Sequence, residues 1–232
     1  MSQQRFVLTF SCPDRHGIVA AVTSFLAEHN YNIEESSQFE DRLEKRFFMR
    51  TEFSAANEQA TELEALRTQF SHLASADDMD WQLCDLSDRP KVVVAVSRWG
   101  HCLNTLLNKW KVGSLPIDIV GVVSNHNDMR DLVEWYNLPF YHLPISKDTK
   151  PQQEAQILEV MNDTKADFLV LARYMQILSN ELCEKLAGRA INIHHSFLPG
   201  FKGAKPYHQA YDRGVKLIGA TAHFVTSDLD EG

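Results

Sequence analysis

An amide and an imidazole lie two residues apart in the stretch 191–203, which reads Ile-Asn-Ile-His-His-Ser-Phe-Leu-Pro-Gly-Phe-Lys-Gly. The stretch begins as an apolar strand and continues as a loop rich in proline and glycine. Because successive side chains of a strand point to opposite faces, we expect Asn192 and His194 on one face and His195 on the other. Open α/β sheets usually carry their chemistry where a strand ends. We therefore predict a reactive site around Asn192 and His194, with His195 in a structural role.

The same residues do not predict a metal site. His194 and His195 are adjacent in a strand, so their side chains diverge, and no His-x-x-Glu-His-type spacing is present. The four cysteines are scattered, with no Cys-x-x-Cys pair. We expect no metal, no cofactor and no disulfide framework.

The composition is typical of a soluble globular protein. The chain has 232 residues, of which 44% are hydrophobic and 23% charged, and its formal net charge is -8. An acidic surface argues against a nucleic-acid partner. The N-terminus has no signal-peptide pattern, and no apolar run approaches the length that spans a bilayer. We predict a cytoplasmic protein with no membrane partner.

The N-terminal part alternates strand and helix patterns in the order β-α-β-β-α-β. Strands are expected at residues 5–11, 33–39, 46–53 and 80–84, and two amphipathic helices lie between them, the first capped by Asp14. This order is the ferredoxin-like split pattern. We predict a domain at residues 1–85 and a short polar linker at residues 86–90.

The remaining residues, 91–232, alternate buried strands with helices. Strands are expected at residues 91–96, 117–124, 140–143, 168–172, 191–194 and 217–225. This alternation predicts an α/β domain with a mainly parallel open sheet. Gly100 is the only glycine after the first strand, so the loop is neither a dinucleotide fingerprint nor a P-loop.

The N-terminal domain resembles the ACT module. The likeness rests on Pro13-Asp14-Arg15-His16-Gly17-Ile18-Val19 and on Asn32-Ile33 downstream. It implies a small amino-acid effector held by Asp14, Gly17, Asn32 and Ile33, or alternatively a surface used for dimerisation alone. Either function favours a homo-oligomer.

The C-terminal domain resembles the folate-dependent formyltransferase family. The likeness rests on Asn192-Ile193-His194, on Ser196 with Leu198-Pro199, on His223-Phe224-Val225-Thr226 and on Leu229-Asp230-x-Gly232. It implies that Asn192, His194 and Asp230 are catalytic, with His223 and Ser196 orienting them. The segment 170–178 resembles the folate pocket, so the implied substrate contacts are Met175, Gln176, Ile177, Leu178, Val225, Thr226 and Leu229. Arg173 and Gln176 depart from the ribonucleotide formyltransferases, which favour a small and a basic residue there.

An ACT module joined to such a domain resembles the members that hydrolyse 10-formyltetrahydrofolate to formate and tetrahydrofolate. The implied role is to supply formate for purine synthesis and to balance the one-carbon pool. The chemistry agrees, because Asn192 and a protonated His194 can donate to the oxygen that becomes negative when water attacks a formyl group. Trp99, His101 and Cys102 fill the loop where an acceptor phosphate would need bare backbone. We expect water to be the nucleophile.

Two other functions fit the same residues: formyl transfer to a phosphorylated amine, and a non-catalytic amino-acid sensor. The resemblance also implies further strand and helix after Gly232. We therefore expect a C-terminally truncated chain in which Asp230 lies on a terminus that frays, with weakened activity.

Overall fold

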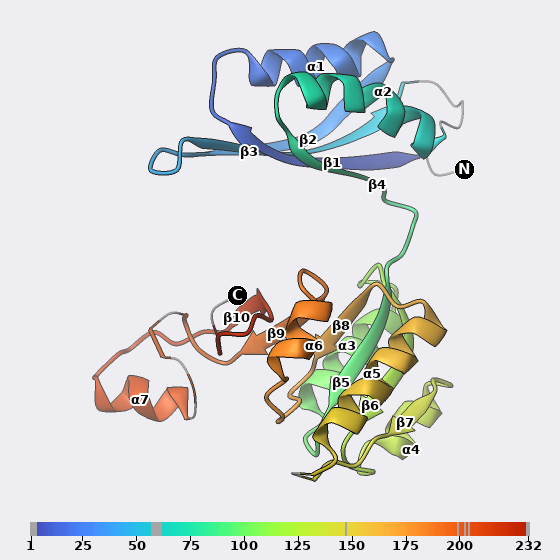
Figure 1. Ribbon diagram of the computed structural model, residues 1–232, viewed down its shortest axis with the longest axis vertical. Coiled ribbons are helices and arrows are strands. Elements are labelled where there is room, and N and C mark those ends of the chain that lie inside the picture. The colour runs from blue at the N-terminus through green and yellow to red at the C-terminus, as the bar shows by residue number, and fades with distance from the viewer. Residues whose placement is uncertain are drawn as a thin grey trace. The chain divides into compact units, whose positions relative to one another are not determined.

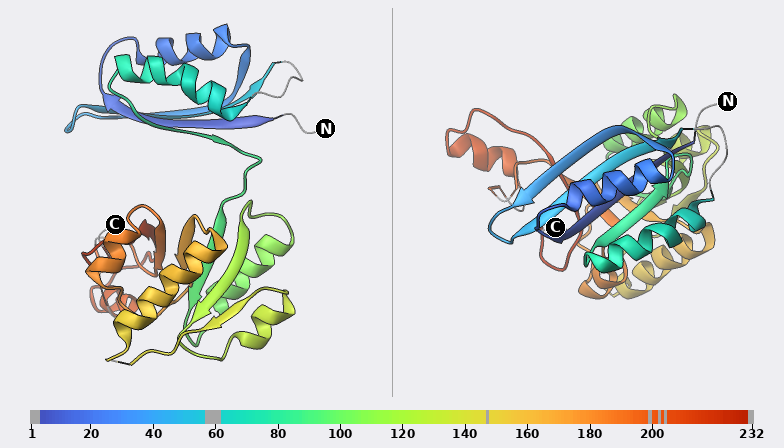
Figure 2. Two further views of the ribbon diagram at one scale, coloured as in Figure 1. Left: turned by 45° about the vertical axis from the view of Figure 1, so that its right-hand side comes forward. Right: turned by 90° about the horizontal axis from the view of Figure 1, so that it is seen from above.

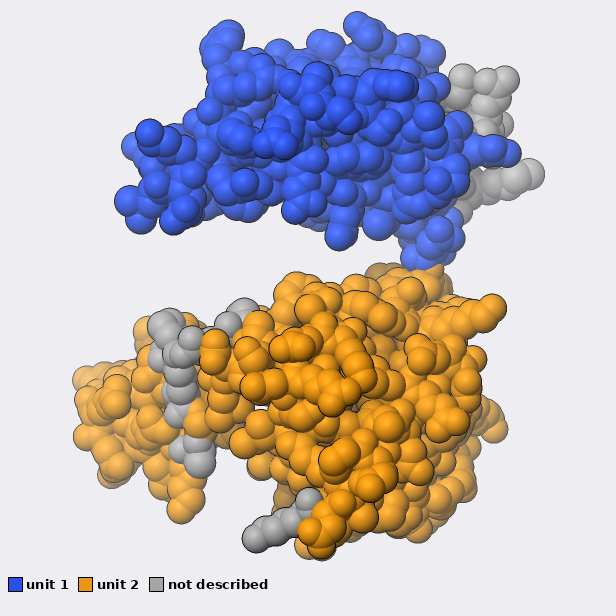
Figure 3. Space-filling view, viewed as in Figure 1, with its two compact units in different colours: residues 1–88 blue, residues 89–232 orange. Residues whose placement is uncertain are grey.

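The computed structural model describes residues 4–56, 62–146, 148–198, 200–201, 203 and 205–230. Pro199 and Gly232 of the motifs above lie outside these ranges. The chain forms two compact units, residues 1–88 and 89–232, which are coloured separately in Figure 3. Each unit has its own hydrophobic core.

The first unit is a four-stranded antiparallel sheet with two helices on one face. Its elements are β1 (Arg5–Pro13), α1 (Ile18–Glu28), β2 (Tyr31–Asp41), β3 (Arg46–Ala55), α2 (Leu63–Ala76) and β4 (Asp80–Asp85). The strand order is β2-β3-β1-β4, and Figure 2 shows both helices against the same face. The predicted β-α-β-β-α-β order is confirmed.

Alternation along the strands builds the core of this unit. Phe6, Leu8 and Phe10 of β1 are buried toward the helices, where they meet Val22 of α1 and Phe70 of α2. The predicted cap of the first helix was wrong. Helix α1 begins after Gly17, whose φ of 92° is left-handed, and no side chain caps it. Asp14 instead donates its backbone N–H to the Lys45 carbonyl at 2.9 Å, which joins it to the β2–β3 turn.

The second unit is a six-stranded sheet with helices on both faces (Figure 1). Its strands are β5 (Lys91–Val96), β6 (Asp118–Ser124), β7 (Phe140–His142), β8 (Phe168–Leu171), β9 (Ala190–His194) and β10 (Thr221–Phe224). Its helices are α3 (His101–Lys111), α4 (Arg130–Trp135), α5 (Lys150–Thr164), α6 (Asn180–Lys185) and α7 (Pro206–Asp212). The order is β10-β9-β8-β5-β6-β7, and only β10 is antiparallel to its neighbour. The predicted mainly parallel α/β sheet is confirmed.

Two apolar layers enclose the sheet of the second unit. Val92, Val94 and Val96 face α3 and α4, whereas Val93 and Ala95 face α5 and α6. Burial on both faces explains why β5 is a continuous run of small apolar residues. The parallel strands place the carboxyl ends of β5, β6, β8 and β9 at one edge.

The last strand is shorter than the predicted range 217–225. Strand β10 pairs with β9 from Thr221 opposite His194 to Phe224 opposite Ile191. Because β9 ends at His194, the residues before Thr221 have no strand to pair with. Leu217 and Ile218 are accordingly exposed outside the sheet.

Candidate active site

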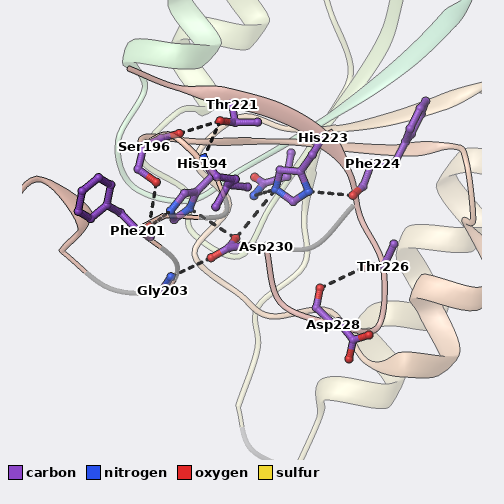
Figure 4. A network of polar contacts seen from close by, with 12 residues as sticks. His194, Ser196, Phe201, Gly203, Thr221, His223, Phe224, Thr226, Asp228 and Asp230 are labelled. Carbon is purple, nitrogen blue, oxygen red and sulfur yellow. Dashed lines mark hydrogen bonds and ion pairs between the residues drawn. The ribbon is translucent and has the colours of Figure 1, made fainter. Parts of the chain in front are cut away.

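His194 and Asp230 are brought together although 36 residues separate them in the sequence. Nδ1 of His194 lies 3.4 Å from Oδ1 of Asp230, and both side chains are buried. The second carboxylate oxygen accepts the Gly203 backbone N–H at 3.0 Å. Figure 4 shows the imidazoles of His194 and His223 both directed at this carboxylate.

The other nitrogen of the His194 ring meets a backbone carbonyl. Nε2 lies 2.9 Å from the oxygen of Phe201, to which the Ser196 hydroxyl also donates at 2.8 Å. A carbonyl oxygen only accepts, so Nε2 carries a hydrogen in this arrangement. Both ring nitrogens therefore face oxygen atoms, and a hydrogen on each would have an acceptor.

Asn192 is held by the neighbouring strand. Its amide nitrogen lies 3.3 Å from Nε2 of His223, which is directly opposite in the β9–β10 pair. His223 Nδ1 lies 2.8 Å from the Phe224 carbonyl, so the hydrogen belongs on Nδ1 and Nε2 accepts from Asn192. One N–H of the Asn192 amide is thereby used, and the other has no partner among the residues that the structure describes.

The loop after β9 is attached to β10 through Thr221. Its hydroxyl donates to the Ser196 carbonyl at 2.8 Å and accepts the Leu198 N–H at 3.2 Å. This pair of bonds fixes the backbone at Ser196 and Leu198, which follow His194 closely in the chain. Strand pairing and loop thus position the same imidazole.

The segment after β8 is anchored at both ends. Ser97, at the end of β5, accepts the Met175 N–H at 3.0 Å and donates to Asn125 Oδ1 at 2.7 Å. At the other end, the buried Glu154 of α5 accepts the Ser179 backbone N–H at 2.8 Å. Ser179 in turn caps α6 with its hydroxyl.

The residues predicted to hold folate differ in exposure. Met175 is 61% exposed, Ile177 66% and Leu229 53%, so these apolar side chains are open to a ligand. Gln176 and Val225 are half-buried and Thr226 is exposed. Leu178 instead packs in the core against α5 and α6. The structure therefore offers Met175 and Ile177, rather than Leu178, as an apolar surface beside the parallel-strand edge.

Burial perturbs two groups at this edge. Burial, with the nearby charges of His194 and Arg173, lowers the pKa of His195, and the Asp230 carboxylate opposes this effect. The His195 ring lies 5.5 Å from that of His194 and 5.2 Å from that of Tyr207. Burial also raises the pKa of Tyr174 to about 12, and its hydroxyl accepts from Gln153 Nε2 at 2.6 Å. These shifts favour neutral His195 and neutral Tyr174.

Several groups that build the candidate site could not be recognised from the sequence. The Phe201 carbonyl and the Gly203 N–H act through the backbone, which any residue type supplies. The Ser97–Asn125 pair joins the ends of two strands 28 residues apart. The polar residues after β5 and β6 could have indicated it, because the carboxyl ends of parallel strands share one edge.

The four residues predicted to bind an effector lie in the first unit, on the connection between β1 and α1 and at the start of β2. They are Asp14, Gly17, Asn32 and Ile33, and all four are exposed. Within the described ranges, no helix is long and apolar enough to cross a membrane. Among those same residues, no group of three or more acidic, histidine or cysteine side chains could hold a metal ion.

Comparison with known families agrees with this architecture. Residues 90–232 match the formyl transferase family, and residues 6–70 match the ACT domain. The chain therefore combines an ACT module with a domain of the formyl transferase class.

Similarity to individual proteins is more specific. The chain is 55% identical to formyltetrahydrofolate deformylase of Corynebacterium sp. (strain P-1), over 100% of this chain and 81% of that relative. It is also similar to the crystal structures of formyltetrahydrofolate deformylases from Burkholderia mallei ATCC 23344 and Pseudomonas syringae pv. tomato str. DC3000. For the first, the TM-score is 0.88 and the identity 55%, over 99% of this chain and 80% of that chain. For the second, the TM-score is 0.92 and the identity 47%, over 100% of this chain and 78% of that chain. The chain belongs to the formyltetrahydrofolate deformylase family.

Proposed function

We propose that the second unit hydrolyses 10-formyltetrahydrofolate to formate and tetrahydrofolate, with Asn192, His194 and Asp230 as the catalytic residues. The observation that carries this is the convergence of an amide, an imidazole and a buried carboxylate at the end of β9, with Asp230 3.4 Å from His194. Family membership supports the same reaction, since its members are named for removing this formyl group.

The reaction requires an electrophilic formyl carbon and an attacking water. The water oxygen bonds to the formyl carbon, the carbon–nitrogen bond breaks, and one water proton ends on the folate nitrogen. The product leaves as formate and releases the remaining acidic proton to solvent. Negative charge develops on the formyl oxygen during attack, so catalysis depends on donors aimed at that oxygen.

Asn192 and His194 are suited to be those donors. One donor is the Asn192 N–H that is not bonded to His223 and has no other partner in the described part of the chain. The Nε2–H of His194 is the second, after it exchanges the Phe201 carbonyl for the formyl oxygen. The Ser196 hydroxyl remains on that carbonyl, so the exchange leaves no orphaned acceptor. One such donor is typically worth about 2.7–4 kcal/mol of barrier.

Asp230 stabilises positive charge on His194 and accepts a proton relayed from the attacking water. Its second oxygen is already satisfied by Gly203, so the carboxylate is held in place. General acid–base help of this kind contributes roughly 10²–10⁴-fold to the rate. Folate would lie against Met175 and Ile177, with Gln176, Val225, Thr226 and Leu229 nearby.

Water is the nucleophile in this proposal because the loop after β5 does not offer a phosphate cradle. Trp99 is 64% exposed, His101 opens α3, and only Gly100 lacks a side chain there. A ribonucleotide acceptor would need bare backbone at that place.

The deciding experiment measures formate release from 10-formyltetrahydrofolate with no acceptor present. We expect the wild-type chain to release formate, and Asn192→Ala and His194→Ala to lose at least 100-fold in kcat, by the scale of one lost oxyanion donor. A thermal shift with folate should persist in both variants. Consumption of substrate that requires an added amine acceptor would instead establish a formyltransferase.

For the first unit we propose a small amino-acid effector at Asp14, Gly17, Asn32 and Ile33, and self-association of the chain. The open face of its sheet carries Phe39 and Phe48, with ring centroids 6.3 Å apart and exposures of 64% and 40%. Thermal shift with individual amino acids tests the effector, and sedimentation velocity tests the oligomer. We also propose a cytoplasmic location, with formate feeding purine synthesis.

A further inference from the structure

Arg173 lies at the edge where the proposed chemistry occurs. Strand β8 ends at Leu171, which is level with Asn192 of β9 in the parallel pairing. Ala172 continues toward the same edge and donates its N–H to the Ala95 carbonyl at 2.8 Å. Arg173 is therefore the β8 counterpart of His194, one strand away.

The backbone of Arg173 is in an unusual conformation. Its φ is 60°, in the left-handed region that costs free energy for any residue with a Cβ and little for glycine. The neighbours on both sides are buried, and Tyr174 is fixed through its hydroxyl by Gln153. Such local strain is typically kept where a side chain is needed in one direction.

The guanidinium has an unmet hydrogen-bonding requirement. Nε of Arg173 is buried and has no hydrogen-bond partner among the described residues. None of the ion pairs found within the described ranges involves Arg173 either. A buried N–H of a charged group left unpaired is costly. Arg173 is only half-buried as a residue, so it is the outer N–H groups of this under-satisfied guanidinium that a ligand can reach.

The positive charge of Arg173 acts on a histidine next to the proposed catalytic residues. It contributes to lowering the pKa of His195, whose ring adjoins that of His194. Among the described residues, the carboxylate that acts on the same imidazole is Asp230, which is already engaged by His194 and Gly203. The edge therefore holds a permanent cation whose counter-charge is not supplied by the described residues around it.

We propose that Arg173 binds the carboxylate of formate, as a product subsite of the reaction proposed above, on which this inference rests. The formyl group is neutral in the substrate and becomes an anion only after the carbon–nitrogen bond breaks. A fixed guanidinium thus distinguishes product from substrate, and its planar fork matches two carboxylate oxygens. Formate leaves the Asn192–His194 donors for Arg173, which separates it from the folate nitrogen.

The test measures formate binding directly, without folate. The ¹³C-formate line is titrated with wild-type chain, Arg173→Met, Arg173→Gly and Arg42→Met, at constant ionic strength kept with sodium chloride. Arg42→Met removes one exposed positive charge from the first unit and is the matched control. Arg173→Gly fits a φ of 60° and keeps the test valid where Arg173→Met fails to fold.

We expect formate to bind the wild type and the control equally, and both Arg173 variants about tenfold to a hundredfold more weakly. Inhibition of turnover by added formate should weaken by the same factor. Equal formate affinity in wild type and Arg173→Gly, or no formate binding to the wild type, would overturn the inference. Failure of the proposed function would give a different result. Formate would still bind through Arg173, but the chain would release no formate from 10-formyltetrahydrofolate.

Discussion

The amide nitrogen of Asn192 lies 3.3 Å from Nε2 of His223, and that imidazole is fixed in turn by the Phe224 carbonyl at 2.8 Å. A backbone acceptor on β10 therefore sets the tautomer of one ring and, through it, the orientation of an amide on β9. The antiparallel pairing of these strands places Asn192 and His223 directly opposite each other. The amide is oriented before any substrate is bound.

This relationship predicts that His223→Ala lowers kcat by about tenfold with little change in KM, because the released Asn192 amide loses its orientation. Combining His223→Ala with Asn192→Ala should reduce kcat no further than Asn192→Ala alone. His208→Ala, at an exposed histidine, is the control. Additive losses in the double variant would show that His223 acts independently of Asn192.

Replacing the buried carboxylate tests its role in the relay. Asp230→Asn is expected to lower kcat by about 10²–10⁴-fold, because the amide cannot accept a proton or balance a charged His194. Asp228→Asn makes the same change at an exposed side chain two residues away. Steady-state formate release measures both. Equal activity of the two variants would remove Asp230 from the mechanism.

Stability at high pH should depend on Tyr174. Its pKa is about 12 in the folded chain against a usual value of 10.0. Below pH 10 both states keep the phenol proton, but between pH 10 and 12 only the unfolded state loses it. The free energy of unfolding therefore falls as the pH rises, and this group contributes on the order of 1–2 kcal/mol to the fall.

Tyr174→Phe should abolish the contribution of this phenol to the fall in the free energy of unfolding, as measured by urea denaturation between pH 9 and 11.5. Tyr211→Phe removes a hydroxyl that is largely in water and should leave the decline unchanged. An identical pH profile in Tyr174→Phe and wild type would contradict the assignment.

Ser97→Ala removes a hydroxyl that connects three segments. Asn125 loses its donor at a buried position, and the Met175 N–H loses its acceptor at a partly buried one. The free energy of unfolding of the second unit should fall by about 1–3 kcal/mol. Ser114→Ala, at an exposed hydroxyl bonded to a helix carbonyl, should change it by less than about 0.5 kcal/mol. Comparable losses in the two variants would show that the Ser97 bonds add nothing to stability.

Much of the fold could be predicted because it follows from periodicity. Burial on both faces marks β5, and its observed bounds, Lys91–Val96, are those predicted. Alternation along β9 likewise puts Asn192 and His194 on one face, but His195 lies beyond the last residue of the strand and its ring is 5.5 Å from that of His194. The family resemblance pointed to Asp230, which the structure places beside His194.

What could not be predicted depends on backbone geometry and on pairing at a distance. The start of α1 is set by the left-handed Gly17 rather than by the Asp14 side chain. The length of β10 is limited by its partner β9, which no pattern within residues 217–225 reveals. The left-handed conformation of Arg173 is also invisible, because an arginine has no sequence preference for it.

The double anchoring of the segment after β8 has a consequence for ligand recognition. Ser97 accepts the Met175 N–H and Glu154 accepts the Ser179 N–H, so the backbone between these two residues is held at both ends. The conformational entropy of this segment is therefore lost during folding rather than when folate binds. Its two anchored amides should already exchange slowly with deuterated solvent in the ligand-free chain, and added folate should slow them little further.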